Sequence, residues 1–279
     1  METDHDKLLA LLDARMRRGA QSESVSARIE HTPHVVRQSG SDKVWNGILW
    51  SDLESGTADA VIAEQIRHYA GLGQDFEWTL YAHDRPADLG GRLVAAGFTP
   101  EESETLLVAS VADLVRRTSE TDAPAGIELR EVTDEAGVAQ VVAVHEQAFG
   151  TDGTRLGRRI SAQLQESPET FRVHLAVAHH DGREIPVSSA RLELYPGTGF
   201  AGLWGGGTLA EWRGRGVYRA LVSHRARIAA ELGYEYLRVD ASDQSRPILE
   251  RLGFAALTTM TPYQYQYQYQ AQAQARSRP

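Results

Sequence analysis

The sequence has 279 residues, no cysteine and a net charge of −9, with 42% hydrophobic and 24% charged residues. This composition is typical of a globular protein, and the length is sufficient for two domains. The lack of cysteine excludes disulfides, thiolate metal ligands and a cysteine nucleophile. The acidic balance argues against nucleic acid as a partner, because phosphate binding needs a basic face.

The sequence contains no sign of a membrane segment. It has no apolar run long enough to span a bilayer. The charged stretch from Met1 to Leu11 lacks the basic and apolar regions of a signal peptide. We therefore expect no membrane partner and a cytoplasmic location.

The first part of the chain contains a helix–strand–helix pattern that is bounded by glycines. A helix ends near Leu72 and Gly73, and a strand follows over Phe76 to Ala82. Asp84-Arg85-Pro86 then opens a second helix, which ends at Gly97-Phe98. We assign residues 1–116 to a first domain.

Two polar segments divide the rest of the chain. Residues 117–126 read RTSETDAPAG, which is typical of a linker to a second domain over residues 127–263. The low-complexity run YQYQYQYQAQAQARSRP starts at Tyr263, and we assign residues 264–279 to a tail. The alternating tyrosines predict an extension of the last strand, and we expect disorder from Ala271 onward.

The second domain alternates strands and helices. The periodicity predicts strands at Ile127–Val132, Phe171–His179, Val187–Tyr195, Phe200–Leu209 and Tyr236–Asp240. It predicts helices at Ala136–Phe149, Thr154–Leu164, Val217–Leu232 and Pro247–Leu252. Three glycines, Gly205 to Gly207, interrupt the fourth strand and indicate a bulge or a close approach to the backbone.

The end of this domain repeats the pattern of the first. A helix ends at Leu232-Gly233, a strand follows, Ser245-Arg246-Pro247 opens a helix, and Gly253-Phe254 ends it. A duplicated domain with a small insertion explains both copies economically.

The segment Thr208 to Leu221, TLAEWRGRGVYRAL, carries the clearest functional signal. Its glycines permit a tight turn, and the first turn of the following helix has unpaired N–H groups and the positive end of the helix dipole. Such an end binds pyrophosphate, and Arg213, Arg215 and Arg219 add positive charge. A flexible turn is the alternative interpretation. The strand before it and the helix, strand and Leu252-Gly253-Phe254 after it favour binding.

Over about Ile127 to Tyr263 the sequence resembles the GNAT superfamily of N-acetyltransferases. The family signature is Arg or Gln, two residues, Gly, one residue, then Gly or Ala. Arg213 and Gly216 match it, whereas Tyr218 departs from it. The resemblance implies an α+β fold of mixed α/β type. It consists of two tandem GNAT-like domains, each a mixed central sheet flanked by helices, with a V-shaped opening between two central strands.

The resemblance also implies acetyl-CoA as co-substrate, without a metal. Its pantetheine arm would pair with the backbone near Gly206 to Leu209, and its pyrophosphate would lie at the loop. The residues expected to bind it are Gly206, Gly207, Thr208, Leu209, Arg213, Gly214, Arg215, Gly216, Val217, Tyr218 and Arg219. The first domain is a degenerate copy, because its corresponding loop, Asp52 to Asp59, is acidic and repels phosphate.

The sequence departs from the family pattern at a catalytic position. Many family members place a tyrosine that protonates the leaving thiolate where this chain has Leu249. Tyr195, Tyr218 and Tyr263 are then the candidate acids. Direct attack by an amine also requires a general base, for which Glu193 and Asp240 are the candidates. Surface or strand-end charges remain the alternative interpretation of both carboxylates.

Two functions follow from these patterns. The first is an N-acetyltransferase that moves the acetyl group of acetyl-CoA directly to an amine of a small molecule. The second is a non-catalytic CoA-sensing or partner-binding module, which is favoured by Leu249 and by the lack of a carboxylate on Phe200–Leu209. A homodimer formed through the first domain is a further hypothesis. The histidines His31, His34 and His179-His180 lack the spacing of metal ligands, so we expect no metal.

Overall fold

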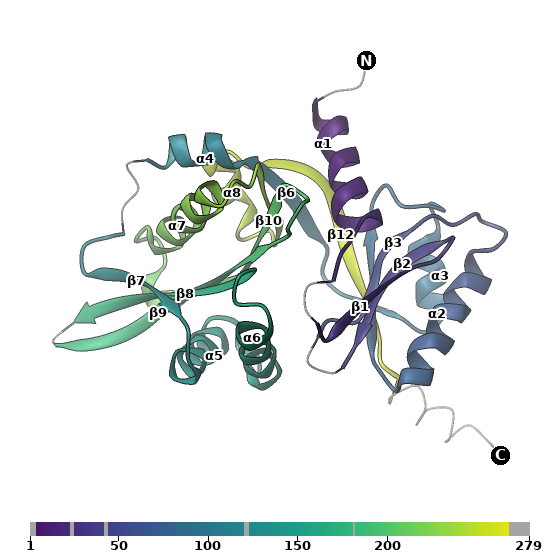
Figure 1. Ribbon diagram of the computed structural model, residues 1–279, viewed down its shortest axis with the longest axis horizontal. Coiled ribbons are helices and arrows are strands. Elements are labelled where there is room, and N and C mark those ends of the chain that lie inside the picture. Colours follow the sequence, from purple (N-terminus) through teal and green to yellow (C-terminus); the bar gives the residue numbers. More distant parts are fainter. Residues whose placement is uncertain (1–3, 23–24, 42–43, 120–122, 181, 268–279) are drawn as a thin grey trace. The chain divides into compact units, whose positions relative to one another are not determined.

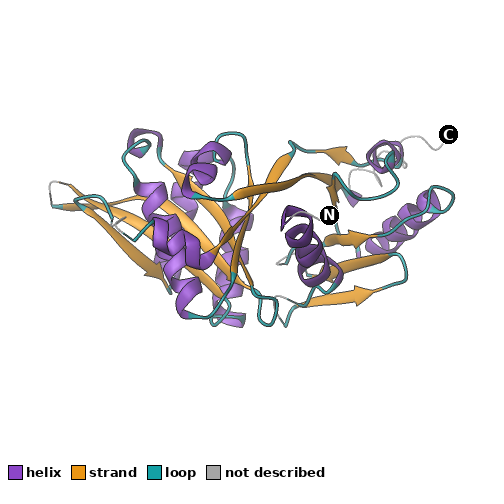
Figure 2. Cartoon of the chain, turned by 90° about the horizontal axis from the view of Figure 1, so that it is seen from above, coloured by secondary structure: helices purple, strands orange, loops and turns teal. Residues whose placement is uncertain are grey.

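The computed structural model describes residues 4–22, 25–41, 44–119, 123–180 and 182–267. The chain forms two compact units, each a mixed sheet with helices (Figures 1 and 2). Unit 1 comprises Met1–Leu106 and Leu257–Pro279, and unit 2 comprises Leu107–Ala256. The architecture is therefore the expected mixed α/β one in two units, and each unit is described by itself.

Unit 1 begins with α1 (Asp4–Leu12) and the π-helical turn η1 (Asp13–Arg18). The elements that follow are β1 (Ala27–His31), β2 (Val35–Gly40), β3 (Gly47–Ser51), α2 (Ala58–Leu72), β4 (Phe76–Tyr81), α3 (Leu89–Ala95) and β5 (Thr99–Pro100). The strand order is β1-β2-β3-β4-β12, where β12 is Ala255–Tyr265. Strands β3 and β4 are parallel, and the other neighbouring pairs are antiparallel.

The core of unit 1 lies between this sheet and the helices α2 and α3. Figure 1 shows these two helices on one side of the sheet and α1 on the other. The core is rich in aromatic residues, and Tyr69 stacks on Phe76 with 4.1 Å between the ring centroids. The Tyr69 hydroxyl donates hydrogen bonds to the carbonyls of Gln38 and Gly47, so its buried polar group is satisfied.

Unit 2 contains the elements predicted for the second domain. They are β7 (Ile127–Val132), α5 (Glu135–Phe149), α6 (Thr154–Glu166), β8 (Phe171–His180), β9 (Arg183–Leu194), β10 (Phe200–Thr208), the short 3₁₀ turn η2 (Ala210–Trp212), α7 (Val217–Glu231), β11 (Tyr236–Ala241) and α8 (Arg246–Leu252). Two earlier elements, β6 (Glu104–Ser110) and α4 (Val111–Arg117), also contribute to this unit. The strand order is β6-β11-β10-β9-β8-β7.

The two faces of the unit 2 sheet are covered by different helices, as Figure 1 shows. Leu192, Leu203 and Val239 pack against Val222 and other residues of α7 on one face. On the other face, β8 residues pack against α5 and α6 through a cluster that includes Val173, Leu175, Val141 and Ile160. Successive residues of a strand point to opposite faces of the sheet. The face of each polar residue of β9 to β11 can therefore be assigned from its buried apolar neighbours.

Each unit receives a strand from the other half of the chain. β6 follows α3 of the first repeat but lies beside β11, and its Leu107 and Ala109 belong to the core of unit 2. β12 follows α8 of the second repeat but pairs with β4 over Met260–Tyr265. The units therefore differ from the contiguous domains expected at residues 1–116 and 127–263. The edges of β4 and β11 are each completed by the last strand of the other repeat.

The structure confirms part of what the sequence predicts for the C-terminal segment. The tyrosine-rich run does extend the last strand as far as Tyr265, which packs into the core of unit 1. The disorder expected from Ala271 falls outside the described residues. In the expected linker, residues 120–122 are likewise outside them.

One helix starts later than the sequence indicates. The residues Asp84-Arg85-Pro86 do not open α3, which begins at Leu89. The reason is that Asp84 turns inward. Its carboxylate accepts two hydrogen bonds from Arg17, at 2.8 and 2.7 Å, and its amide donates to the Tyr81 carbonyl. The side chains of Arg17 and Asp84 are only 3% and 4% exposed, so the pair is buried.

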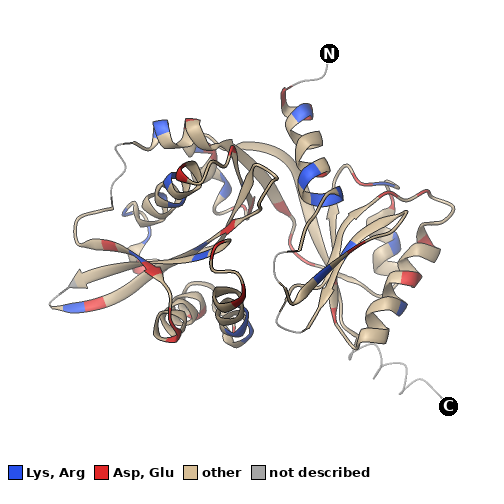
Figure 3. Ribbon diagram, in the orientation of Figure 1, with Lys and Arg blue, Asp and Glu red and all other residues tan. Residues whose placement is uncertain are grey.

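The charges of both units are interspersed along their elements, as Figure 3 shows. The net excess of acidic over basic residues gives a pI of about 5.6. No helix in the described part of the chain is long and apolar enough to cross a membrane.

Candidate functional site

The loop before α7 turns on two glycines in the left-handed region. Gly214 has a φ of 73°, and Gly216, the N-cap of α7, has a φ of 84°. No side chain caps this helix, whereas Ser110 and Asp134 accept hydrogen bonds from the first turns of α4 and α5. The first N–H groups of α7 are thus left without a capping oxygen, which is the arrangement that binds anions at a helix N-terminus.

The three arginines of this loop have different surroundings. Arg213 donates from Nε to the Thr208 carbonyl at 3.0 Å and from Nη2 to the Ala148 carbonyl at 3.3 Å, so it fastens the loop to β10 and α5. The Arg215 guanidinium lies over the Trp212 ring, 4.8 Å from its centroid. Nη2 of Arg219 lies 3.7 Å from where a Cβ on Gly216 would be. Arg215 and Arg219 therefore flank the glycine turn, and Arg213 braces it.

The glycines of β10 coincide with the expected irregularity. The register between β10 and β9 shifts between Trp204 and Gly207, so the pairing is irregular at the glycines. A Cβ on Gly206 would lie 2.7 Å from Cε2 of Tyr218, and one on Gly207 would lie 2.7 Å from Cε2 of Phe149. Such distances do not occur for real Cβ atoms. The two glycines are therefore required for aromatic rings of α7 and α5 to approach the strand.

Some main-chain groups of this stretch are already bonded within the unit. The Gly207 carbonyl accepts a hydrogen bond from Ser188 Oγ at 2.7 Å, and the Leu209 amide donates to the Val187 carbonyl at 2.9 Å. Both contacts are made with β9. A ligand that pairs with the backbone between Gly206 and Leu209 must therefore use the remaining groups.

The strands β10 and β11 part beside this loop. Their parallel register joins Phe200–Gly202 to Tyr236–Arg238, although β10 continues to Thr208 and β11 to Ala241. The ladder thus covers only the first third of β10. The two strands diverge beyond it, which agrees with the V-shaped opening that the sequence resemblance implies.

A polar cluster on β9, β10 and β11 lies at this divergence. Its six residues share one face of the sheet, because Gly202 opposes both Glu193 and Arg238, and Trp204 opposes Arg191. We call this group the β9–β11 polar cluster: Arg191, Glu193, Tyr195, Trp204, Arg238 and Asp240. It lies on the α5 and α6 side, since Phe171 and Val173 of β8 oppose Glu193 and Arg191.

Glu193 is held in this cluster by a chain of hydrogen bonds. The Tyr195 hydroxyl donates to Glu193 Oε2 at 3.2 Å and accepts from Trp204 Nε1 at 3.1 Å. Nη1 of Arg191 lies 3.9 Å from Glu193 Oε1. The Glu193 side chain is 14% exposed, so it is largely buried but within reach of a ligand. Because the Tyr195 hydroxyl donates its proton to Glu193, it is poorly placed to protonate the leaving thiolate.

Asp240 lies on the other strand of the opening. Its carboxylate forms an ion pair with Arg238, whose guanidinium carbon lies 5.5 Å from the Trp204 ring centroid. The Asp240 side chain is 1% exposed, and its Oδ1 has no hydrogen-bond partner among the described residues. A buried carboxylate oxygen without a donor is costly, so a group that donates there would be bound favourably.

His145 reaches the same region from α5. Burial, followed by the positive charge of Arg191, lowers the pKa of His145. Its Nε2 is 3.1 Å from Thr151 Oγ1, and its ring lies 5.0 Å from that of Phe149. A neutral imidazole thus lies close to the β9–β11 polar cluster near neutral pH.

The structure distinguishes between the candidates for the residue that protonates the thiolate. Leu249 is fully buried in the core of unit 2, so its position supplies no acid. Tyr263 pairs with Trp78 and is part of unit 1. Tyr218 lies against Gly206, and burial raises the pKa of its hydroxyl, which keeps it protonated.

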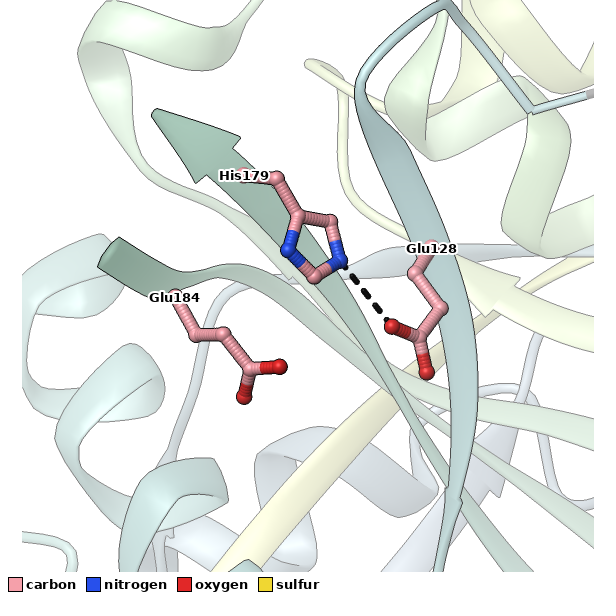
Figure 4. Close-up of side chains that lie close together, drawn as sticks. All are labelled: Glu128, His179 and Glu184. Carbon is pink, nitrogen blue, oxygen red and sulfur yellow. Dashed lines mark hydrogen bonds and ion pairs between the residues drawn. The ribbon is translucent and has the colours of Figure 1, made fainter. Parts of the chain in front are cut away.

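A separate cluster lies on the edge strand β7 and the two strands next to it, β8 and β9. Figure 4 shows Glu128, His179 and Glu184, which come from β7, β8 and β9 and offer ligand atoms within 4.8 Å of one another. However, Arg130 donates to both carboxylates at 2.9 to 3.0 Å. Hydrogen bonds from Arg130 and His179 lower the pKa of Glu128 to about 2. We interpret the cluster as an exposed ion-pair network.

Comparison with known protein families gives a match in the same region. Residues 140–254 match the acetyltransferase (GNAT) family. The matched stretch runs from α5 through β10, the loop before α7 and α8. The second half of this chain is a GNAT acetyltransferase domain. This match confirms the resemblance to the GNAT superfamily that was based on the loop before α7 and on Leu252-Gly253-Phe254. The chain is therefore an acetyltransferase. No curated protein matches the chain.

Solved structures extend the likeness to both units. A GCN5-related N-acetyltransferase from Kribbella flavida superposes with a TM-score of 0.64 at 19% identity, with 92% of each chain covered. A tandem GNAT protein from the clavulanic acid biosynthesis pathway, solved without AcCoA, has a TM-score of 0.59 at 12% identity. The superposition covers 96% of this chain and 97% of the tandem GNAT chain. At these identities the likeness shows the fold, a tandem arrangement of two GNAT-like units.

The sequence did not point to several residues of this candidate site. Arg191 and Arg238 were not singled out, although they lie beside Glu193 and Asp240, and neither was the Trp204 ring next to Arg238. A signal was present on β9, where Arg191, Glu193 and Tyr195 alternate with the buried Leu192 and Leu194. Polar residues on one face of a central strand, with apolar ones on the other, indicate a face that lines a site.

Proposed function

We propose that this chain is an N-acetyltransferase that moves the acetyl group of acetyl-CoA directly to the amine of a small molecule. The observation that carries the proposal is the uncapped, glycine-turned N-terminus of α7 beside the divergence of β10 and β11. The first feature suits the pyrophosphate of CoA, and the second suits its thioester. The GNAT match over residues 140–254 supports both.

The residues proposed to hold acetyl-CoA follow the chain from β10 into α7. Gly206, Gly207, Thr208 and Leu209 would contact the pantetheine arm through backbone groups that β9 does not occupy. Gly214 and Gly216 would bring the amides of Val217, Tyr218 and Arg219 to the pyrophosphate. Arg215 and Arg219 would add charge, and Arg213 would keep the loop in shape.

Glu193 is the proposed general base. The amine nitrogen of the acceptor attacks the thioester carbon, the N–H proton passes to Glu193, and the C–S bond breaks. The thiolate then takes up a proton, for which Tyr218, whose ring lies against Gly206 of β10, is the proposed donor. Asp240, with its unpartnered Oδ1, would accept a hydrogen bond from the acceptor or from a water beside it. Transfer without an acetyl-enzyme is favoured because the chain has no cysteine.

The proposal is tested by turnover with a panel of small amines. Released CoA is read with a thiol reagent, and the protein itself gives no background because it contains no cysteine. We expect Glu193→Gln to lower kcat by about 10²–10⁴-fold with little change in the affinity for CoA. Glu128→Gln, a carboxylate in the edge network, is the matched control and should leave kcat unchanged. Full activity in Glu193→Gln would exclude this residue as the base.

A second function is favoured by one observation. Leu249 fills a core position where many relatives carry the acid, which suits a CoA-binding module without catalysis. The same experiment decides between the two functions. Tight CoA binding without turnover of any amine in the panel would support the module, and turnover of any amine would support the enzyme.

A further inference from the structure

Two pairs of an arginine and a carboxylate lie on the same face of the sheet in the β9–β11 polar cluster, and they differ in their contacts. Arg238 donates a hydrogen bond to Asp240 Oδ2, and the two side chains are 10% and 1% exposed. Nη1 of Arg191 and Oε1 of Glu193 are 3.9 Å apart, which is too far for a hydrogen bond. The Arg238–Asp240 pair is therefore closed, whereas the Arg191–Glu193 pair is open.

The facing atoms of the open pair can be reached by a ligand. The Arg191 guanidinium forms no hydrogen bond with the described residues, and none of its nitrogen atoms is buried. Oε1 of Glu193 also accepts no hydrogen bond from them and is not buried, because the Tyr195 hydroxyl donates to Oε2. The open pair thus presents a charged donor and a charged acceptor side by side.

The separation of these two atoms fits the two charged groups of an α-amino acid. An amino nitrogen and a carboxylate oxygen that are carried by one carbon atom lie about 2.7–3.6 Å apart. With hydrogen bonds of about 2.8 Å at each end, they can bridge Glu193 Oε1 and Arg191 Nη1, which are 3.9 Å apart. An amine without a carboxylate would engage Glu193 and leave Arg191 without a hydrogen bond.

The neighbours of the open pair favour an apolar side chain on that amino acid. Burial, followed by the charge of Arg191, lowers the pKa of His145 on α5, so a neutral imidazole lies beside the arginine. The Phe149 ring is 5.0 Å from the His145 ring, and Phe149 is 52% exposed. Glu146, the carboxylate that acts on His145, accepts a hydrogen bond from the Gly153 amide. An apolar side chain would remove the exposed Phe149 ring from water.

We propose that the acceptor of acetyl transfer is an α-amino acid with an apolar side chain. Its carboxylate binds Arg191, its amino group binds Glu193, and its side chain packs on Phe149. This inference rests on the proposed N-acetyltransferase function and specifies its acceptor. The ammonium group first loses one proton to solvent. Its lone pair then forms the N–C bond, the C–S electron pair leaves with the sulfur of CoA, and the second proton passes to Glu193.

The first test compares amino acids with the amines that lack their carboxylate. The full chain, loaded with CoA, is titrated calorimetrically with L-phenylalanine and L-leucine, and separately with phenethylamine and isoamylamine. We expect each amine to bind at least about tenfold more weakly than its amino acid, because a charge-assisted contact is lost. Amines that bind as tightly as the amino acids, or amino acids that do not bind, would overturn the inference.

Turnover of acetyl-CoA with the same four compounds separates this inference from the proposed function. We expect kcat/KM to be at least about tenfold higher for each amino acid than for its amine. Turnover that is as fast with the amines would overturn the choice of acceptor and leave the N-acetyltransferase function intact. No turnover of any amine would overturn both.

Variants of Arg191 test its contact with the carboxylate. Arg191→Met should weaken the amino acids by about tenfold and leave the amines unchanged, while Arg191→Lys should retain part of the preference. Arg172→Met is the matched control, because Arg172 lies on the next strand, pairs with Glu131 and faces the other side of the sheet. CoA affinity reports that unit 2 is folded in each variant. A preference that survives in Arg191→Met would show that Arg191 does not bind the carboxylate.

Discussion

The two repeats place the same elements around their helix N-termini but build them differently. α2 and α7 both have 15 residues and follow a strand, β3 or β10, that is parallel to the next one. Before α2, the amides of Thr57 and Ala58 both donate to the Glu54 carbonyl, so a turn occupies the start of the helix. Neither helix has a capping side chain, but the N-cap of α7 is Gly216, which has a φ of 84° in the left-handed region.

The loops before α2 and α7 also differ in charge. In the first turn of α2, Asp59 pairs with Arg92 at 3.0 Å, and the preceding loop carries Asp52 and Glu54. The loop of unit 2 carries three arginines instead. The comparison teaches that the fold supplies a helix end in both repeats, whereas the loop sequence decides whether an anion is accepted there.

The largest expected effect concerns the structural role of unit 1. Arg17→Met leaves the buried Asp84 without its partner, so we expect the free energy of unfolding to fall by about 3–5 kcal/mol. CoA affinity of the folded protein should not change, because the pair lies in unit 1. Urea denaturation measures the first quantity and calorimetry the second. Arg92→Met, which removes exposed ion pairs with Asp59 and Asp88, is the matched control and should change the stability little.

The next effect should distinguish the two loops directly. Gly216→Val places a branched side chain at a φ of 84°, so we expect CoA affinity to fall by roughly a hundredfold. The loss should depend little on salt, since its cause is conformational. Gly56→Val is the matched change in unit 1, where a Cβ would meet nothing within 4 Å. If Gly56→Val weakened CoA as much as Gly216→Val, the assignment of CoA to α7 would be wrong.

A smaller and salt-dependent effect is expected for charge. Arg215→Glu should weaken CoA by roughly ten- to a hundredfold at low salt, because a charge-assisted contact is lost. The loss should shrink at high salt, where exposed charges are screened. Titrations at two ionic strengths measure the difference. A loss that is the same at both would show that Arg215 acts through its packing on Trp212 instead.

The smallest effect is expected from removing the acidic charge of unit 1. The triple variant Asp52→Asn, Glu54→Gln, Asp59→Asn should still bind one CoA per chain, because the Glu54 carbonyl continues to occupy the amides before α2. Calorimetric stoichiometry checks this. Two sites in the variant would mean that charge alone had kept CoA from unit 1.

Much of unit 2 was predictable from its sequence. The helices and strands predicted between Ile127 and Leu252 lie within a few residues of their expected positions, whereas β6 and α4 were not predicted. The loop before α7 was also singled out, because a strand precedes it and a helix, a strand and Leu252-Gly253-Phe254 follow it. The elements before Asp52 were not predicted. β2, VVRQSG, has buried residues on both faces and therefore lacks the alternation of a half-exposed strand.

The remaining differences depend on contacts between residues far apart in the chain. Asp84 leaves the start of α3 because Arg17, 67 residues earlier, binds it. Arg238 and Trp204 meet only because β10 and β11 are neighbours. β6 and β12 likewise lie in the sheet of the other repeat because they are neighbours of β11 and β4 there. Local propensity carries no information about such partners, so periodicity could not reveal them.

The position of β12 also sets an order on folding during synthesis. The ribosome releases most of unit 1 first, yet the strand that pairs with β4 follows every element of unit 2. Until that strand emerges, the edge of β4 presents unpaired main-chain groups to other nascent chains or to chaperones. Unit 2 already has β6 when its own elements leave the ribosome. The unit that is begun first is therefore the one that is finished last.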